Sequence, residues 1–227
     1  MPARVLWPAR HSLYDLMLKR ASDGHAAFES EMQGNPTDPS KCEWPAEYWG
    51  DHIWFSDWPK AIQLRVVAVD PSKGSDARQG DYSAIVSLAV TEDLRLWVDA
   101  DLKRRDTEAI VADAVQQAKQ FQPDIFVIEE NAFQHLLKPS FAKLADKEID
   151  HPLQVVGYTN TVPKVVRIRR LTPYLSQKRL RFKARSPGAA LLVQQGQQFG
   201  TDAHDDGLDA LEMALRAAIQ RWNSLRR

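Results

Sequence analysis

Hydrophobic positions after residue 60 alternate between strand-like runs and helix-like periods. Runs of apolar and β-branched residues predict strands at 64–70, 82–90, 94–98, 125–129 and 153–156. A 3.6-residue period predicts helices at 106–121, 134–146, 165–175, 189–199 and 204–222, with a short basic strand at 180–182. Three strands that pair as a meander are therefore followed by strands that alternate with helices. This order predicts an α/β domain with one core, in which α-helices flank a mixed β-sheet.

The first 60 residues have a different character. Five of the seven tryptophans lie there, together with several prolines, and little helical or strand periodicity follows Met32. We interpret 1–60 as an N-terminal arm or linker that packs its aromatic side chains on another surface. The folded domain is then expected to span 61–227.

Composition narrows the class of protein. The 30 basic and 30 acidic residues give a formal net charge of zero, and the 44% apolar content excludes wholesale disorder. No apolar run approaches the roughly 18 residues that cross a bilayer, and the start of the chain lacks a signal-peptide core. The single cysteine, Cys42, excludes an internal disulfide and a multi-cysteine zinc site. We therefore expect a soluble, intracellular protein with no membrane partner.

The zero net charge hides an asymmetry. Residues 151–201 contain no Asp or Glu but nine Lys or Arg residues. Such a segment produces a positive field that attracts polyanions, although a solvated basic face is an equally simple interpretation. Lys164, Arg167 and Arg170 have helical spacing and are the candidates for contacts with DNA phosphates.

Acidic residues occupy positions where they need a counter-charge. Asp70 and Glu129 each end a buried apolar strand, and Asp205, Asp206 and Asp209 lie at the start of the last helix. If these acids converge, divalent cations relieve their repulsion, and all-oxygen ligands suit Mg²⁺ or Mn²⁺. The structural alternatives are an Asx-turn at Asp70, an ion pair at Glu129 and helix-dipole stabilisation at the last helix.

Four segments together resemble the nuclease domain of the large terminase subunit of tailed bacteriophages. They are 66–71 (VVAVDP), 80–84 (GDYSA), 127–131 (VIEEN) and 204–211 (HDDGLDAL), and the resemblance covers roughly 60–222. The stretch 28–33 (FESEMQ) is similar to the segment that joins the ATPase and nuclease domains of that family. The combined motifs in this order are fairly specific, whereas each alone is not.

The resemblance implies a ribonuclease H-like fold and a metal-dependent endonuclease that cuts concatemeric viral DNA during genome packaging. It implies that Asp70, Glu129 and the cluster of Asp205, Asp206 and Asp209 are the catalytic metal ligands. The phosphate loop of the family's ATPase motor is not found in this sequence, so we expect a separate or fused packaging ATPase. The implied partners are double-stranded DNA, the portal and the small terminase subunit, in the cytoplasm of an infected bacterial host.

The carboxylates suit hydrolysis with two Mg²⁺ or Mn²⁺ ions about 4 Å apart that flank the scissile phosphate. We assign the bridging ligand to Asp70, because it ends the most central of the predicted strands. A Holliday-junction resolvase or another ribonuclease H-like nuclease, such as one acting on RNA–DNA hybrids, would use the same carboxylates. A non-catalytic DNA-binding or scaffold protein for packaging would use them structurally.

Overall fold

The computed structural model describes residues 10–23, 42–71, 82–130, 137–151, 153–201 and 204–225. Contacts divide the chain into two units, Met1–Glu43 and Trp44–Arg227. In the first unit, helix α1 spans Leu13–Asp23, and the Ser12 hydroxyl accepts a hydrogen bond from the Asp15 amide at 3.1 Å. This contact is typical of a helix N-cap. None of the helices in the described ranges has the length and hydropathy that a bilayer crossing needs.

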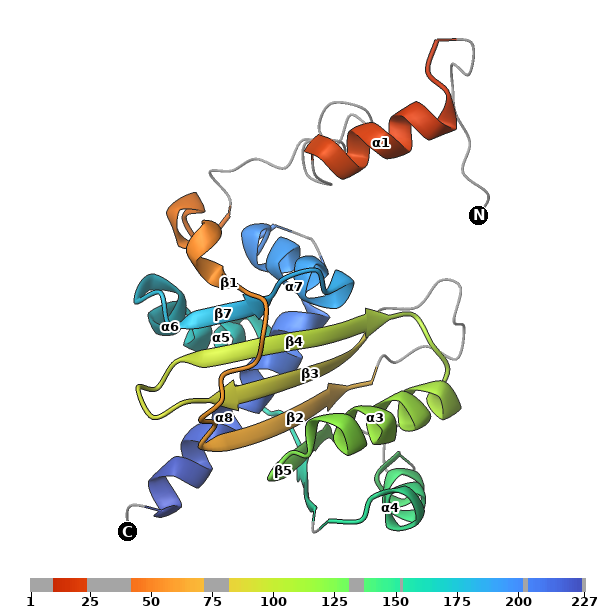
Figure 1. Ribbon diagram of the computed structural model, residues 1–227, viewed down its shortest axis with the longest axis vertical. Helices are drawn as coiled ribbons and strands as arrows, with labels where there is room; N and C mark the ends of the chain where they lie inside the picture. The colour runs from red at the N-terminus through yellow and green to blue at the C-terminus, as the bar shows by residue number, and fades with distance from the viewer. Residues whose placement is uncertain are drawn as a thin grey trace. The chain divides into compact units, whose positions relative to one another are not determined.

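The second unit is built on a mixed β-sheet (Figure 1). Within the described residues its seven strands are β1 (Trp54–Phe55), β2 (Leu64–Asp70), β3 (Ser83–Val90), β4 (Leu96–Lys103), β5 (Ile125–Glu129), β6 (Gln154–Tyr158) and β7 (Leu180–Lys183). Their order is β1-β7-β4-β3-β2-β5-β6. Strands β2, β3 and β4 form an antiparallel meander, and the other neighbours pair in parallel. The expected mixed sheet is confirmed.

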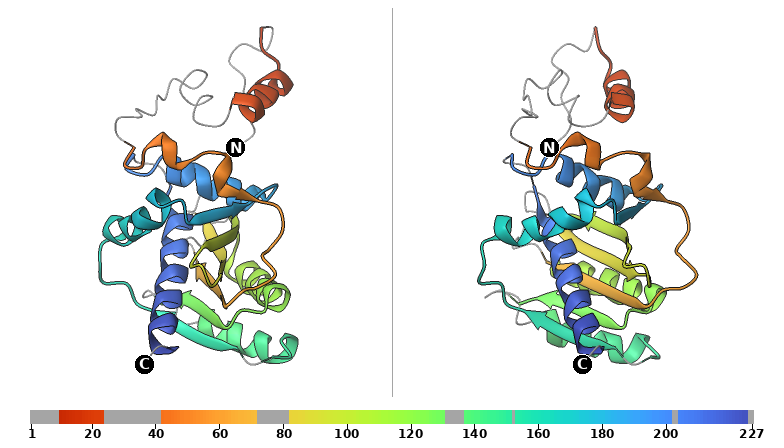
Figure 2. Two further views of the ribbon diagram at one scale, coloured as in Figure 1. Left: turned by 60° about the vertical axis from the view of Figure 1, so that its left-hand side comes forward. Right: turned by 90° about the vertical axis from the view of Figure 1, so that its left-hand side faces the viewer.

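Helices cover both faces of this sheet. They are α3 (Thr107–Phe121), α4 (Leu137–Glu148), α5 (Lys164–Ile168), α6 (Thr172–Ser176), α7 (Pro187–Gln197) and α8 (Asp206–Leu225), with 3₁₀ turns η2 (Ala46–Tyr48), η3 (Asp51–Ile53) and η4 (Arg169–Leu171). Helix α8 lies along one face of the meander, and α3 lies on the opposite face (Figure 2). The period of two in β2 explains the two cores: Val66 and Ala68 pack under α8, whereas Val67 and Val69 pack under α3.

Strand β1 is absent from the sequence prediction, and two predicted elements differ most in extent or continuity. Strand β4 continues to Lys103 rather than ending at 98, because Asp99 and Asp101 alternate with buried Ala100 and Leu102. The helix expected over 165–175 is instead α5, the turn η4 and α6. The stretch 28–33, residues 80–81 and 131 of the resembling segments, and the expected helix start at 134 lie outside the described residues.

Residues 44–60 pack on the sheet unit. Trp44 is buried, its indole donates a hydrogen bond to the Thr172 hydroxyl at 2.8 Å, and its ring centre lies 4.6 Å from that of Phe199. Strand β1 extends the sheet by pairing with β7. From Trp44 onward this stretch therefore packs aromatic side chains on the sheet, and contacts divide the chain between Glu43 and Trp44.

Candidate metal centre

Strand geometry places two of the predicted acids side by side. Side chains alternate between the faces of a strand, so Asp70 points to the same face as Val66 and Ala68, the face that α8 covers. Glu129 likewise shares a face with Val127, which belongs to the same core. Strands β2 and β5 are parallel neighbours, and Asp70 and Glu129 lie one residue beyond the Val69–Ile128 pair. The two carboxylates therefore emerge together at one edge of the sheet.

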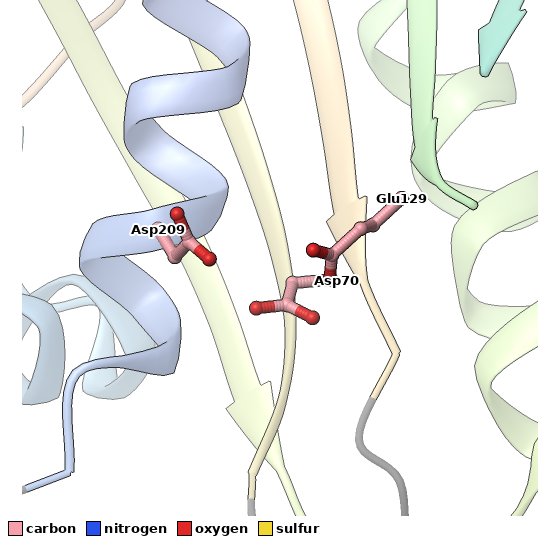
Figure 3. Close-up of side chains that lie close together, drawn as sticks. All are labelled: Asp70, Glu129 and Asp209. Carbon is pink, nitrogen blue, oxygen red and sulfur yellow. The ribbon is translucent and has the colours of Figure 1, made fainter. Parts of the chain in front are cut away.

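Helix α8 brings the third carboxylate. Its first turns pack against the sheet, and Asp209 is only 2% exposed. One carboxylate oxygen from each of Asp70, Glu129 and Asp209 lies within 4.8 Å of the other two (Figure 3). The cluster thus joins two strands and a helix that are far apart in the sequence, and all three side chains are buried.

Burial and nearby negative charge make Asp70 and Asp209 hard to ionise. Burial, followed by the nearby charge of Glu129 and a hydrogen bond to it, raises the pKa of Asp70 well above its usual range. Burial also raises the pKa of Asp209 to about 6, although the positive charges of Arg167 and Lys164 oppose the shift. A buried set of hard oxygen donors that repel one another fits a divalent cation, whose charge would relieve the repulsion.

A row of ion pairs connects α8 to the basic segment before it. Lys164 Nζ donates to Asp206 Oδ1 at 2.7 Å, Arg167 donates to Asp209, and Arg170 Nη1 donates to Glu212 Oε1 at 2.7 Å. The partners of each pair are 42 positions apart, and both series advance by three residues per step. We call these three pairs the ion-pair ladder. Three basic side chains of the acid-free segment are therefore neutralised by the acids of α8 that follow it in the sequence.

The ladder separates the predicted acids into two groups. Asp205 and Asp206 each contact Lys164 Nζ at 2.7 Å and are not in the three-carboxylate cluster, whereas Asp209 is. Asp206 nevertheless keeps one buried oxygen, Oδ2, that has no hydrogen-bond partner among the described residues. A buried acceptor of this kind is costly unless a ligand or ordered water satisfies it.

The three basic side chains of the ladder, which are the predicted DNA contacts, differ in their exposure to solvent. The side chain of Arg167 is 6% exposed and contacts the cluster, so it is the least accessible of the three predicted DNA contacts. The side chains of Lys164 and Arg170 are 32% and 46% exposed and reach the surface beside their carboxylate partners.

Sequence reasoning missed two residues beside the cluster. Asn160 Nδ2 donates to Glu129 Oε1 at 2.8 Å, and Arg216 Nη2 donates to Asn160 Oδ1 at 2.7 Å. The sequence gives no signal for Asn160: it lies two residues after Tyr158, and only the structure shows that Tyr158 pairs with Glu129 across β5 and β6.

Comparison with known proteins gives a family and a fold. Residues 67–218 match the family described as the terminase RNaseH-like domain. The large terminase of a thermophilic bacteriophage has a similar fold, with a TM-score of 0.50, 12% identity and 73% of this chain covered; this chain spans 42% of that protein.

Two further solved structures show weaker likeness. The nuclease domain of the large terminase subunit gp2 of bacterial virus Sf6 has a TM-score of 0.49 at 12% identity, with 78% of this chain and 95% of that chain covered. Thermus thermophilus RuvC has a TM-score of 0.42 at 16% identity, with 71% and 97% covered. A search of curated proteins finds no match.

Proposed function

The chain belongs to the family of terminase RNaseH-like domains, and we propose that it is a metal-dependent DNA endonuclease that cuts concatemeric viral DNA during genome packaging. The observation that carries this proposal is the convergence of Asp70, Glu129 and Asp209 from three separate elements. Three buried carboxylates are unfavourable for folding, because each must be desolvated beside like charges. A function at this place explains why the chain keeps them. A purely structural role would be served better by apolar side chains of similar size.

The acids and their neighbours would hold two Mg²⁺ or Mn²⁺ ions. Asp70 would be the shared ligand, because it ends β2, an interior strand next to β5. Glu129 would hold one ion and Asp209 the other, with Asp205 or Asp206 as further candidates near the same helix start. Bound ions would activate water for attack on the phosphodiester and stabilise the departing 3′ oxygen. The protein itself supplies a buried carboxylate cluster, and no side-chain nucleophile is required.

Phosphate contacts are proposed for the exposed members of the ladder. Lys164 and Arg170 have donors in addition to those that bind Asp206 and Glu212, and both side chains reach the surface. Arg167, which lies deeper, would act on DNA through its effect on Asp209. Such contacts add affinity and salt dependence without sequence preference.

In the packaging setting, a separate or fused ATPase would deliver double-stranded DNA to this domain. The portal and the small terminase subunit are the other proposed partners, in the cytoplasm of the infected host. These assignments rest on the family and not on contacts in this chain.

The test is cleavage of supercoiled plasmid by the full chain in Mn²⁺, in Mg²⁺ and in EDTA. Wild type should nick and linearise the plasmid with metal only, and Glu129→Gln should lose the activity. Glu108→Gln, an exposed acid on α3, is the matched control and should cleave like wild type. Cleavage by Glu129→Gln equal to that of wild type, or cleavage in EDTA, would contradict the proposal. A strong preference for four-way junctions or RNA–DNA hybrids would show that the substrate is not the viral DNA duplex proposed here.

A further inference from the structure

Asn160 connects one carboxylate of the cluster to helix α8. It follows β6, and its Nδ2 donates to Glu129 Oε1 at 2.8 Å while its Oδ1 accepts from Arg216 Nη2 at 2.7 Å. We propose that Asn160 is the positioning residue for Glu129 as a metal ligand, and that Arg216 fixes the direction of the Asn160 amide. This inference rests on the proposed function, since it treats Glu129 as a ligand.

The direction of the amide follows from the chemistry of its two neighbours. A guanidinium has donors only, so the group of Asn160 that faces Arg216 must be the carbonyl oxygen. The NH₂ group then faces Glu129 and donates to it. The reversed amide would place oxygen against carboxylate and NH₂ against guanidinium, which are two repulsive contacts. Arg216 therefore determines that Glu129 meets a donor.

Arg216 is itself held in place by several contacts. Its guanidinium lies 4.2 Å from the centre of the Tyr158 ring, and its Nη2 lies 3.7 Å from Glu212 Oε2. The Tyr158 hydroxyl donates to Gln220 Oε1 at 2.6 Å, which ties the end of β6 to the next turn of α8. Arg216 thus has little freedom to turn away from Asn160.

This arrangement gives α8 two roles in one site. It supplies Asp209 directly, and about two turns later it supplies Arg216, which acts on Glu129 through Asn160. One rigid helix then sets the positions of two of the three carboxylates. With Oε1 of Glu129 restrained by Asn160, the carboxylate is oriented before a cation arrives, and the entropy of ordering it is already lost on folding.

The experiment measures Mn²⁺ binding to the full chain by calorimetry, together with the melting temperature in EDTA. Partners of this kind change metal affinity by about 10- to 100-fold, so Asn160→Ala should weaken Mn²⁺ binding by that factor. Arg216→Met should weaken it less, and the double variant should equal Asn160→Ala alone, because Arg216 acts through Asn160. Arg216→Lys keeps a charged donor and should bind closer to wild type than Arg216→Met. Gln154→Ala, an exposed position on β6, should bind like wild type.

The outcomes separate this inference from the proposed function. If Glu129→Gln loses Mn²⁺ binding while Asn160→Ala binds like wild type, the positioning role is overturned and the metal site stands. If Glu129→Gln also binds like wild type, the metal site fails. Additive losses in the double variant would overturn the role of Arg216. If Asn160→Ala does not fold, Asn160→Ser takes its place, and a lower melting temperature with unchanged Mn²⁺ affinity would show a structural role only.

Discussion

Arg167 donates a hydrogen bond to Asp209 inside the protein, where the two side chains are 6% and 2% exposed. The pair joins the basic segment at 164–170 to the three-carboxylate cluster, because Asp209 belongs both to the ion-pair ladder and to the cluster. A guanidinium and a divalent cation would both neutralise the same carboxylate. The charge of Arg167 would therefore be part of the proposed metal site even though arginine is not a ligand.

This relationship predicts how removal of Arg167 affects stability. Arg167→Met leaves Asp209 buried without its partner, and breaking a buried pair in this way costs about 3–5 kcal/mol. In thermal denaturation, saturating Mn²⁺ should raise the melting temperature of Arg167→Met more than that of wild type, because the cation replaces the lost counter-charge.

Two variants control this measurement. Arg167→Met with Asp209→Asn should recover stability in EDTA, since no charge is left unpaired. Arg169→Met, at an exposed neighbouring position, should respond to Mn²⁺ like wild type. An equal Mn²⁺ response in Arg167→Met and wild type would show that Arg167 and the cation do not share Asp209.

Because the pKa of Asp70 is raised, we predict that Asp70→Asn increases the stability of the fold in a pH-dependent way. A carboxyl group whose folded-state pKa is raised stabilises the fold at low pH, and that contribution is lost as pH rises from its unfolded pKa to its folded pKa. In EDTA, Asp70→Asn should therefore be close to wild type at pH 4 and more stable than wild type at pH 7.5. Urea denaturation measures this difference. Asp57→Asn, at an exposed position, should show no such pH dependence, and a destabilised Asp70→Asn at pH 7.5 would argue against mutual repulsion in the cluster.

Metal binding should release protons. The pKa of Asp209 is raised to about 6 by burial, and that of Asp70 is also raised, so protons compete with the cation below neutral pH. Mn²⁺ affinity should increase between pH 5.5 and pH 7.5. Calorimetry in two buffers with different ionisation enthalpies counts the released protons. Constant affinity with no release would contradict the raised pKa values.

The exposed ladder members predict the salt dependence of DNA binding. Each phosphate contact adds about 0.9 to the slope of log K against log salt. Lys164→Gln and Arg170→Gln should each reduce the slope by about one for a DNA duplex, measured by fluorescence anisotropy in EDTA. Lys60→Gln, at an exposed position between β1 and β2, serves as the control. An unchanged slope in both variants would remove these residues from the DNA contact.

The fold could be predicted from the sequence wherever one physical signal dominated. Apolar runs such as 64–70 and 125–129 are typical of strands buried in a sheet. An acid at the end of such a run needs a counter-charge, which made Asp70 and Glu129 candidates for the site. Strand β1 escaped prediction because two residues carry no periodicity; it exists through pairing with β7.

The division of labour among the α8 acids could not be predicted in the same way. Asp206 and Asp209 are both suited to a helix start. Only the packing of α5 against α8 pairs Lys164 with Asp206 and Arg167 with Asp209. A usable signal was present in the shared three-residue spacing of Lys164, Arg167 and Arg170 with Asp206, Asp209 and Glu212. Asn160 offered no signal of type or spacing, because its role depends on a strand register and a helix position that only the folded chain brings together.

The most direct measurement is anomalous diffraction from a crystal of the full chain soaked in Mn²⁺. The account predicts a manganese peak bound by the carboxylate oxygens of Asp70, Glu129 and Asp209, at the roughly 2.0–2.3 Å distances of hard cations to oxygen. A well-ordered crystal that shows these three side chains without manganese at saturating concentration would contradict it.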